Sequence, residues 1–133
     1  MTSPPSKALI DLAELSSSSK RSAAEELYFR ALDLIASGES GEASRLLREC
    51  VAIDPHFADA LHGLTRALQD AGELDEAIHV ACRLIALEPD DVLAHTRLSI
   101  LYQAKGMVPE AEAESTRAKL LGWKQQLREG ASR

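Results

Sequence analysis

Three glycines recur along the chain at a fixed interval of 34 residues, at Gly38, Gly72 and Gly106. Three alanines repeat the same interval, at Ala43, Ala77 and Ala111. Two prolines, Pro55 and Pro89, keep it as well. A period of this length indicates one supersecondary unit copied in tandem, in which each copy covers the apolar face of its neighbour.

The prolines divide the chain into units 24–57, 58–91 and 92–125. Apolar residues recur within each unit at three- and four-residue intervals, which predicts two helices per unit. The first helices are expected near 24–37, 58–71 and 92–105, and the second near 41–53, 75–87 and 109–121. The repeated glycines end the first helices, because glycine adopts a left-handed conformation at no steric cost. Asp91 is expected to cap the helix that begins at Val92.

The repeated pattern resembles the tetratricopeptide repeat, a unit of two helices with small and bulky apolar residues at set positions. The residues that carry the resemblance are Leu27, Ala31, Leu34, Ala43, Leu47, Cys50 and Pro55 in the first unit, Leu61, Leu64, Leu68, Ala77 and Pro89 in the second, and Leu98, Ser99, Tyr102, Ala111 and Ala118 in the third. No stretch alternates with a period of two, so strands are not expected. The resemblance implies an all-α solenoid of three helix-turn-helix repeats with a C-terminal capping segment.

The third unit departs from the pattern at two positions. His95 stands where the family has a large apolar residue, and Trp123 stands where a third proline is due. These departures indicate an atypical last repeat, because the end of an array needs a face compatible with solvent. We expect Trp123 to pack as a cap over the last helix pair, with a partner-facing tryptophan as the alternative.

The repeats define three parts of the chain: a flexible leader at 1–22, a tetratricopeptide repeat domain at 23–127 and a C-terminal tail at 128–133. Four serines at 16–19 are expected to act as a linker. Leu9, Leu12 and Leu15 give the leader a short amphipathic pattern. This segment either folds back on the array, dimerises as an extra helix, or is disordered until it meets a partner.

The charge lies mainly on the repeats, where residues 23–125 hold 10 basic and 18 acidic side chains, a balance of −8. Such an array repels phosphate backbones, which argues against a nucleic-acid partner. No apolar run approaches the roughly 20 residues that a membrane-spanning helix needs, so membrane insertion is not expected. The N-terminus lacks the basic and apolar regions of a secretory signal, and a cytoplasmic location is predicted.

Catalytic and metal-binding patterns are not evident in the sequence. Cys50 and Cys82 form no CxxC pair, and the four histidines are scattered, so buried or partly buried structural thiols are expected and no metal site. There is no glycine-rich phosphate loop and no nucleophile paired with a base. The chain is therefore predicted to be non-enzymatic and to need no cofactor.

The resemblance implies that partners bind a concave surface formed by the first helices. The candidate binding residues on it are Tyr28, Leu32, Ile35, His62, Arg66, Gln69, Thr96, Arg97, Ile100 and Gln103. Apolar side chains of a partner peptide or helix would contact the first unit, and arginine and glutamine would bind its backbone or carboxylates. This predicts a protein-binding adaptor or assembly factor. Two alternatives are a self-associating scaffold, hence a homo-oligomer, and a secretion-type chaperone, since the three-repeat chaperones of type III secretion have a similar layout.

One further use of the family is testable in the sequence. Repeat proteins that hold the C-terminal carboxylates of heat-shock chaperones do so with lysine, asparagine and arginine at five positions. Those positions are occupied here by Tyr28, Leu32, Gly63, Leu93 and Arg97. Only Arg97 matches, so binding of a chaperone tail is not predicted.

Overall fold

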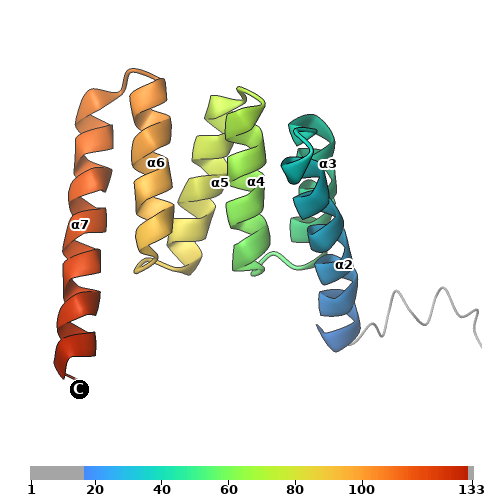
Figure 1. Cartoon of the computed structure of the whole chain (residues 1–133), viewed down its shortest axis with the longest axis horizontal. Coiled ribbons are helices and arrows are strands. Elements are labelled where there is room, and N and C mark those ends of the chain that lie inside the picture. The colour runs from blue at the N-terminus through green and yellow to red at the C-terminus, as the bar shows by residue number, and fades with distance from the viewer. Residues whose placement is uncertain (1–16, 132–133) are drawn as a thin grey trace, which may run out of the picture.

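A computed structural model describes residues 17–131 as six helices joined by short turns. The helices are α2 (Ser17–Ala36), α3 (Ser40–Ile53), α4 (Ala58–Asp70), α5 (Leu74–Leu87), α6 (Val92–Ala104) and α7 (Val108–Ala131). Each helix packs against the next one in the chain, and α2 also contacts α4. The result is a row of helix pairs along the long axis of the molecule (Figure 1). The expected all-α solenoid is confirmed, and the described residues contain no strand.

The turns inside the three helix pairs have the same geometry. Gly38, Gly72 and Gly106 have φ values of 82°, 80° and 77°. In each turn the backbone N–H after the glycine donates to a carbonyl near the end of the first helix, at 2.8 Å in all three cases. This hydrogen bond closes a turn of six residues. It is typical of a helix that ends in a left-handed residue, for which glycine is favoured. The predicted role of the repeated glycines is therefore confirmed.

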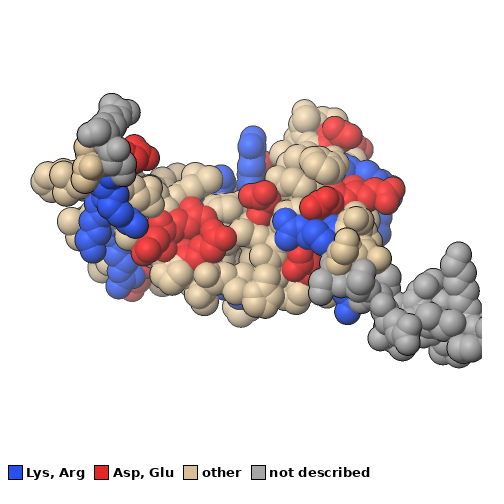
Figure 2. Space-filling model, turned by 90° about the horizontal axis from the view of Figure 1, so that it is seen from below, with Lys and Arg blue, Asp and Glu red and all other residues tan. Residues whose placement is uncertain are grey.

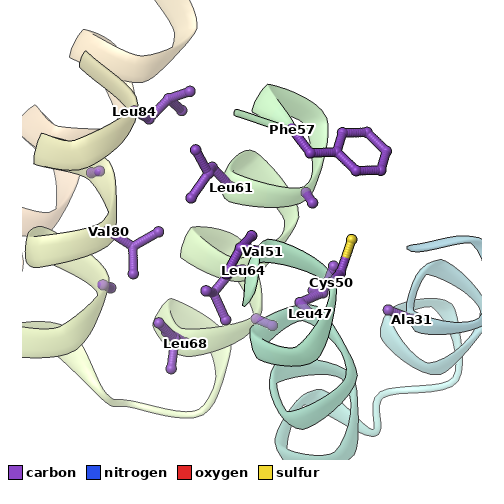
Figure 3. Close-up of a cluster of buried hydrophobic side chains, with 14 of the residues drawn as sticks. Ala31, Leu47, Cys50, Val51, Phe57, Leu61, Leu64, Leu68, Val80 and Leu84 are labelled. Atoms are coloured by element: carbon purple, nitrogen blue, oxygen red, sulfur yellow. The ribbon is translucent and has the colours of Figure 1, made fainter. Parts of the chain in front are cut away.

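The core lies between successive helices rather than in one central layer. Figure 3 shows side chains of α3, α4 and α5 pointing into the space between these helices. The largest fully buried ones include Leu47, Leu61, Leu64, Leu68 and Leu84. Ala43 and Ala77 are also completely buried. Small side chains at these positions let the paired helices approach closely.

His95 keeps its buried position in the third unit by forming polar contacts. Its Nδ1 lies 2.7 Å from Glu114 Oε2, and its Nε2 lies 2.8 Å from the Pro89 carbonyl oxygen. Because a carbonyl only accepts, Nε2 carries a proton, and a second proton lies between Nδ1 and the carboxylate. Glu114 is also buried and contacts Arg117. A hydrogen-bonded network of buried polar groups thus replaces the apolar residue expected at this point.

The N-terminal boundary of the array differs from the prediction. The helix α2 begins at Ser17, so residues 17–22, the last part of the predicted flexible leader, are helical. Arg21 explains why, because its guanidinium binds Asp54 at 3.0 Å and Glu25 at 3.1 Å and lies 3.9 Å from the centre of the Phe57 ring. These contacts attach the first turns of α2 to the turn between α3 and α4. The apolar pattern at 9–15 lies outside the described residues.

The C-terminal prediction is also corrected. The helix α7 continues without a break to Ala131, through most of the expected tail. Trp123 does not pack as a cap, because 65% of its surface is exposed. The physical reason is the missing third proline: its counterpart Pro89 follows α5, whereas tryptophan leaves the backbone N–H that lets α7 continue.

Candidate protein-binding surface

The ten candidate residues lie on α2, α4 and α6, the first helix of each unit. We call the surface that these three helices form the A-helix surface. Five of the ten are exposed and five are half-buried. The exposed ones are Leu32, Arg66, Thr96, Ile100 and Gln103, and the half-buried ones are Tyr28, Ile35, His62, Gln69 and Arg97.

Tyr28 and Ile35 contribute to packing inside the molecule. Both pack against the core, and the ring centre of Tyr28 lies 5.1 Å from that of Phe57. Burial raises the pKa of the Tyr28 hydroxyl, and the negative charge of Asp59 raises it further. Truncation of Tyr28 would therefore damage the joint between α2 and α4. It is a poor probe of partner binding.

His62 links α4 to the start of α6. Its Nε2 lies 2.6 Å from Asp91 Oδ2. The other carboxylate oxygen of Asp91 accepts a bond of 3.1 Å from the backbone N–H of Ala94, which confirms the predicted cap of α6. His62 Nδ1 is buried and has no hydrogen-bond partner. His62 Nε2 therefore contributes to packing inside the molecule and is not available to a partner.

Arg66 and Arg97 place two positive charges close together on α4 and α6. Arg66 is exposed, and its nearest carboxylate is that of Asp70, 3.9 Å away. Burial lowers the pKa of the half-buried Arg97, the charge of Arg66 lowers it further, and Asp70 offsets part of this effect. Arg97 Nε is buried without a hydrogen-bond partner. A carboxylate or carbonyl from a partner would relieve both the repulsion and the unpaired donor.

Large apolar side chains are exposed on the same three helices. Leu93 is 52% exposed, Ile100 is 48% exposed, and Leu32 is also exposed. Leu93 was not among the ten candidates; it is the second residue of its unit, where the other two units have Glu25 and Asp59. The sequence signal that could have included it is an apolar residue at a repeat position that is acidic in the other two units. These residues add exposed apolar surface, of the kind found in protein interfaces, to the surface that also carries the two arginines.

The remaining candidates are less central. Thr96 donates its hydroxyl to the Val92 carbonyl of its own helix. Gln103 lines a hollow of about 210 Å³ between α6 and α7, together with Ser99 and Glu112. Val108 and Ala111 also line this hollow, so Gln103 borders a mixed polar and apolar surface of the last helix pair.

The two cysteines have different surroundings. Cys50 is buried, and its Sγ lies 3.1 Å from the Ala24 carbonyl oxygen. Burial raises the pKa of this thiol to about 11. Cys82 is exposed, which corrects the expectation that both thiols are at least partly buried. Within residues 17–131, no group of three or more histidine, cysteine or acidic side chains is arranged to hold a metal ion.

The described helices are also too short or too polar to cross a lipid bilayer.

Comparison with known proteins agrees with this geometry. Residues 34–81 match the family model of the tetratricopeptide repeat. The fold is that of the tetratricopeptide repeat proteins. The resemblance seen in the sequence is thereby confirmed. No curated protein matches the chain significantly.

Three solved structures illustrate the likeness. One is the Yersinia enterocolitica type III secretion chaperone SycD in complex with a peptide of the translocator YopD, with 22% identity and a TM-score of 0.74 over 90% of this chain and 92% of that one. Another is MamA, with 24% identity and a TM-score of 0.76 over 80% and 62%. The third is the second repeat domain of Spaghetti (RPAP3) bound to the HSP90 peptide SRMEEVD, with 19% identity and a TM-score of 0.72 over 76% and 94%. At identities this low, the structural likeness establishes the shared fold alone.

Proposed function

We propose that this chain is a non-enzymatic protein-interaction module whose A-helix surface binds a segment of a partner protein. The observation that carries the proposal is the combination of exposed apolar side chains with the Arg66 and Arg97 pair on that surface. Apolar anchors supply most of the binding energy in such interfaces, and arginine selects for carboxylates and backbone carbonyls. A cytoplasmic location forms part of the same proposal.

The structural relatives support a peptide ligand. SycD was solved with a peptide of the translocator YopD, and the RPAP3 domain with an HSP90 peptide. A secretion-type chaperone is the more specific form of the proposal, and it is supported by the likeness to SycD over nine tenths of both chains. An HSP90 tail is disfavoured, because of the five positions that hold such a tail only Arg97 matches.

Site-specific photo-crosslinking tests the proposal. A photoreactive amino acid is placed at Leu93 or Ile100 on the A-helix surface, and at Glu49 on the exposed face of α3 as the control. After irradiation in cell extract, mass spectrometry identifies the attached proteins. We expect a discrete product from the A-helix positions that the control does not give. Crosslinks of equal yield at all three positions would contradict the proposal.

With the identified client, affinities distinguish the surfaces quantitatively. Ile100→Glu and Arg66→Glu change exposed side chains, so both variants should keep the fold. Each should weaken binding about five- to thirtyfold, the usual effect of removing an interface anchor. The matched control Glu49→Lys should leave the affinity unchanged. A loss caused by the control alone would move the binding site to the outer face.

A further inference from the structure

The end of α7 carries an apolar stripe that the array does not cover. Leu120, Trp123 and Leu127 are 52%, 65% and 65% exposed and follow each other at helical spacing, so they lie on one face. No described residue after Ala118 is buried. The side-chain amide of Gln125 donates a hydrogen bond of 3.0 Å to the Asp90 carbonyl oxygen in the neighbouring turn. We call the three apolar residues the α7 stripe.

A hollow lies beside the stripe and has the same character. Its volume is about 250 Å³, and it is lined by the apolar Pro89, Leu120 and Leu121 and by His95, Arg117 and Lys124. Lys119 lies on the other side of the stripe at helical spacing. Figure 2 shows basic side chains gathered at this end of the molecule. Apolar side chains bordered by positive charge fit an occupant that is apolar and acidic.

The charges decide between three kinds of occupant. Two α7 stripes packed against each other would bring their lysines together, and this repulsion disfavours direct pairing. An anionic membrane would attract the lysines but repel the adjoining repeats, whose balance is −8. Figure 2 shows a large acidic patch directly beside the basic end. An acidic amphipathic segment of protein satisfies both the apolar and the charged groups.

The chain itself contains such a segment outside the described residues. Residues 8–15, ALIDLAEL, combine Leu9, Leu12 and Leu15 with the acidic Asp11 and Glu14. In a helical conformation, Leu12 and Leu15 would share one face and the two acids would lie beside it. These are the complements of the α7 stripe and its lysines.

The segment has to come from another molecule. Leu15 precedes the first residue of α2 by two positions, and two residues span at most about 7 Å. The helices α3 to α6 separate α2 from α7, which lie at opposite ends of the array (Figure 1). A leader therefore cannot place residues 8–15 on the α7 stripe of its own chain. The start of α2 and the end of α7 extend past the same edge of the array in Figure 1, which suits a reciprocal exchange between two copies.

We propose that residues 8–15 of one copy dock on the α7 stripe of a second copy, so that two chains exchange leaders and form a closed dimer. Each copy supplies one segment and one stripe, and the contact is complete at two chains. This surface is separate from the A-helix surface, so it leaves partner binding free.

Trp123 reports on the proposed contact because it is the only tryptophan in the chain. Full-length protein is diluted from about 500 to about 1 μM while emission and mass are followed, since weak self-association dissociates in this range. At high concentration we expect a mass twice the 14.4 kDa of one chain and a Trp123 emission shifted to shorter wavelength. Dilution should reverse both changes over the same range.

Variants test the two sides of the contact without changing the reporter. Leu12→Glu combined with Leu15→Glu should weaken dimerisation about tenfold or more, while Thr2→Glu combined with Ser6→Glu adds the same charge and should not. Asp11→Lys with Glu14→Lys should also weaken the dimer. Mixing that variant with one carrying Lys119→Glu and Lys124→Glu should restore a dimer that contains one copy of each. In it the basic leader meets the acidic stripe, and the natural leader meets the natural stripe. Circular dichroism checks that all variants remain helical.

Several outcomes would overturn the proposal. One is a mass of 14.4 kDa at every concentration. Another is a dimer that the leader variants leave intact. If the protein stays monomeric and vesicles containing phosphatidylserine shift the emission of Trp123, then the α7 stripe contacts membranes instead.

Discussion

The middle repeat and the last helix come from the same 34-residue pattern, yet they are buried to very different extents. The helix α4 buries six of its 13 residues, whereas α7 buries three of 24. The helix α4 contacts α2, α3 and α5, while the main neighbour of α7 is α6. The difference shows that burial in this fold depends on the number of neighbouring helices more than on the sequence of the helix itself.

The largest expected difference concerns leucines. Leu68 in α4 is completely buried and Leu127 in α7 is mostly exposed. Leu68→Ala should lower the free energy of unfolding by about 3 kcal/mol, because it removes buried apolar contacts and leaves a cavity. Leu127→Ala should change it by less than about 0.5 kcal/mol in dilute solution. Urea unfolding followed by circular dichroism measures both, and equal losses would show that α7 is packed as tightly as α4.

A smaller effect is expected at the joint between α6 and α7. His95→Leu restores the apolar residue of the family pattern but leaves Glu114 buried without its histidine, so the free energy of unfolding should fall by about 1.5 kcal/mol. The double variant His95→Leu with Glu114→Leu removes the buried charge as well. It should recover part of the loss, since an apolar pair can replace a buried ion pair. Thermal or urea unfolding of the single and double variants gives the comparison, and a stabilised single variant would contradict it.

The smallest effect concerns an ion pair between the first two repeats. The Arg48 guanidinium donates to both carboxylate oxygens of Glu76, at 2.9 and 2.7 Å. These hydrogen bonds lower the pKa of Glu76. Arg48→Met should cost roughly 0.5 kcal/mol at neutral pH, the usual value for an exposed pair.

The pH dependence of that cost follows from the direction of the shift. A carboxylate with a lowered pKa in the folded state stabilises the fold above its unfolded pKa, and the contribution disappears as the pH falls through the folded pKa. The difference between the natural chain and Arg48→Met should therefore begin to shrink near pH 4, the ordinary range of a glutamate, and vanish once the pH lies below the folded pKa. Urea unfolding at pH 7 and pH 3 measures it. Arg45→Met serves as control, because Arg45 pairs within α3 alone; a difference that persists at pH 3 would point to lost packing by the arginine stem.

The sequence predicted the helices that lie inside the repeats within a few residues of their observed bounds. The reason is that glycine at the turns and proline after α3 and α5 are local signals with a direct backbone cause. The two ends were predicted less well. The start of α2 depends on Arg21 reaching Asp54, which is 33 positions away, and the length of α7 depends on the absence of a proline at 123.

The candidate surface was predicted by its helices and less well by its individual residues. Repeat position indicated which side chains face away from the helix partner, as with Ile100 and Arg66. Repeat position did not show that Tyr28 would pack against Phe57 or that His62 would bind Asp91, since both contacts join different helices. The proximity of Arg66 and Arg97 likewise depends on how α4 and α6 sit next to each other. Contacts of this kind between neighbouring helices can be identified only in the three-dimensional structure.

The three equal turns also determine how a chain like this can change its length. Deleting one residue inside a helix rotates all later side chains of that helix by about 100°, which turns packing residues toward water. Adding or removing 34 residues at once preserves every turn and every packing position. Insertions of whole units are therefore the neutral steps for this architecture. A duplicated segment 58–91 would give a longer array with one more pair of helices and the same two ends.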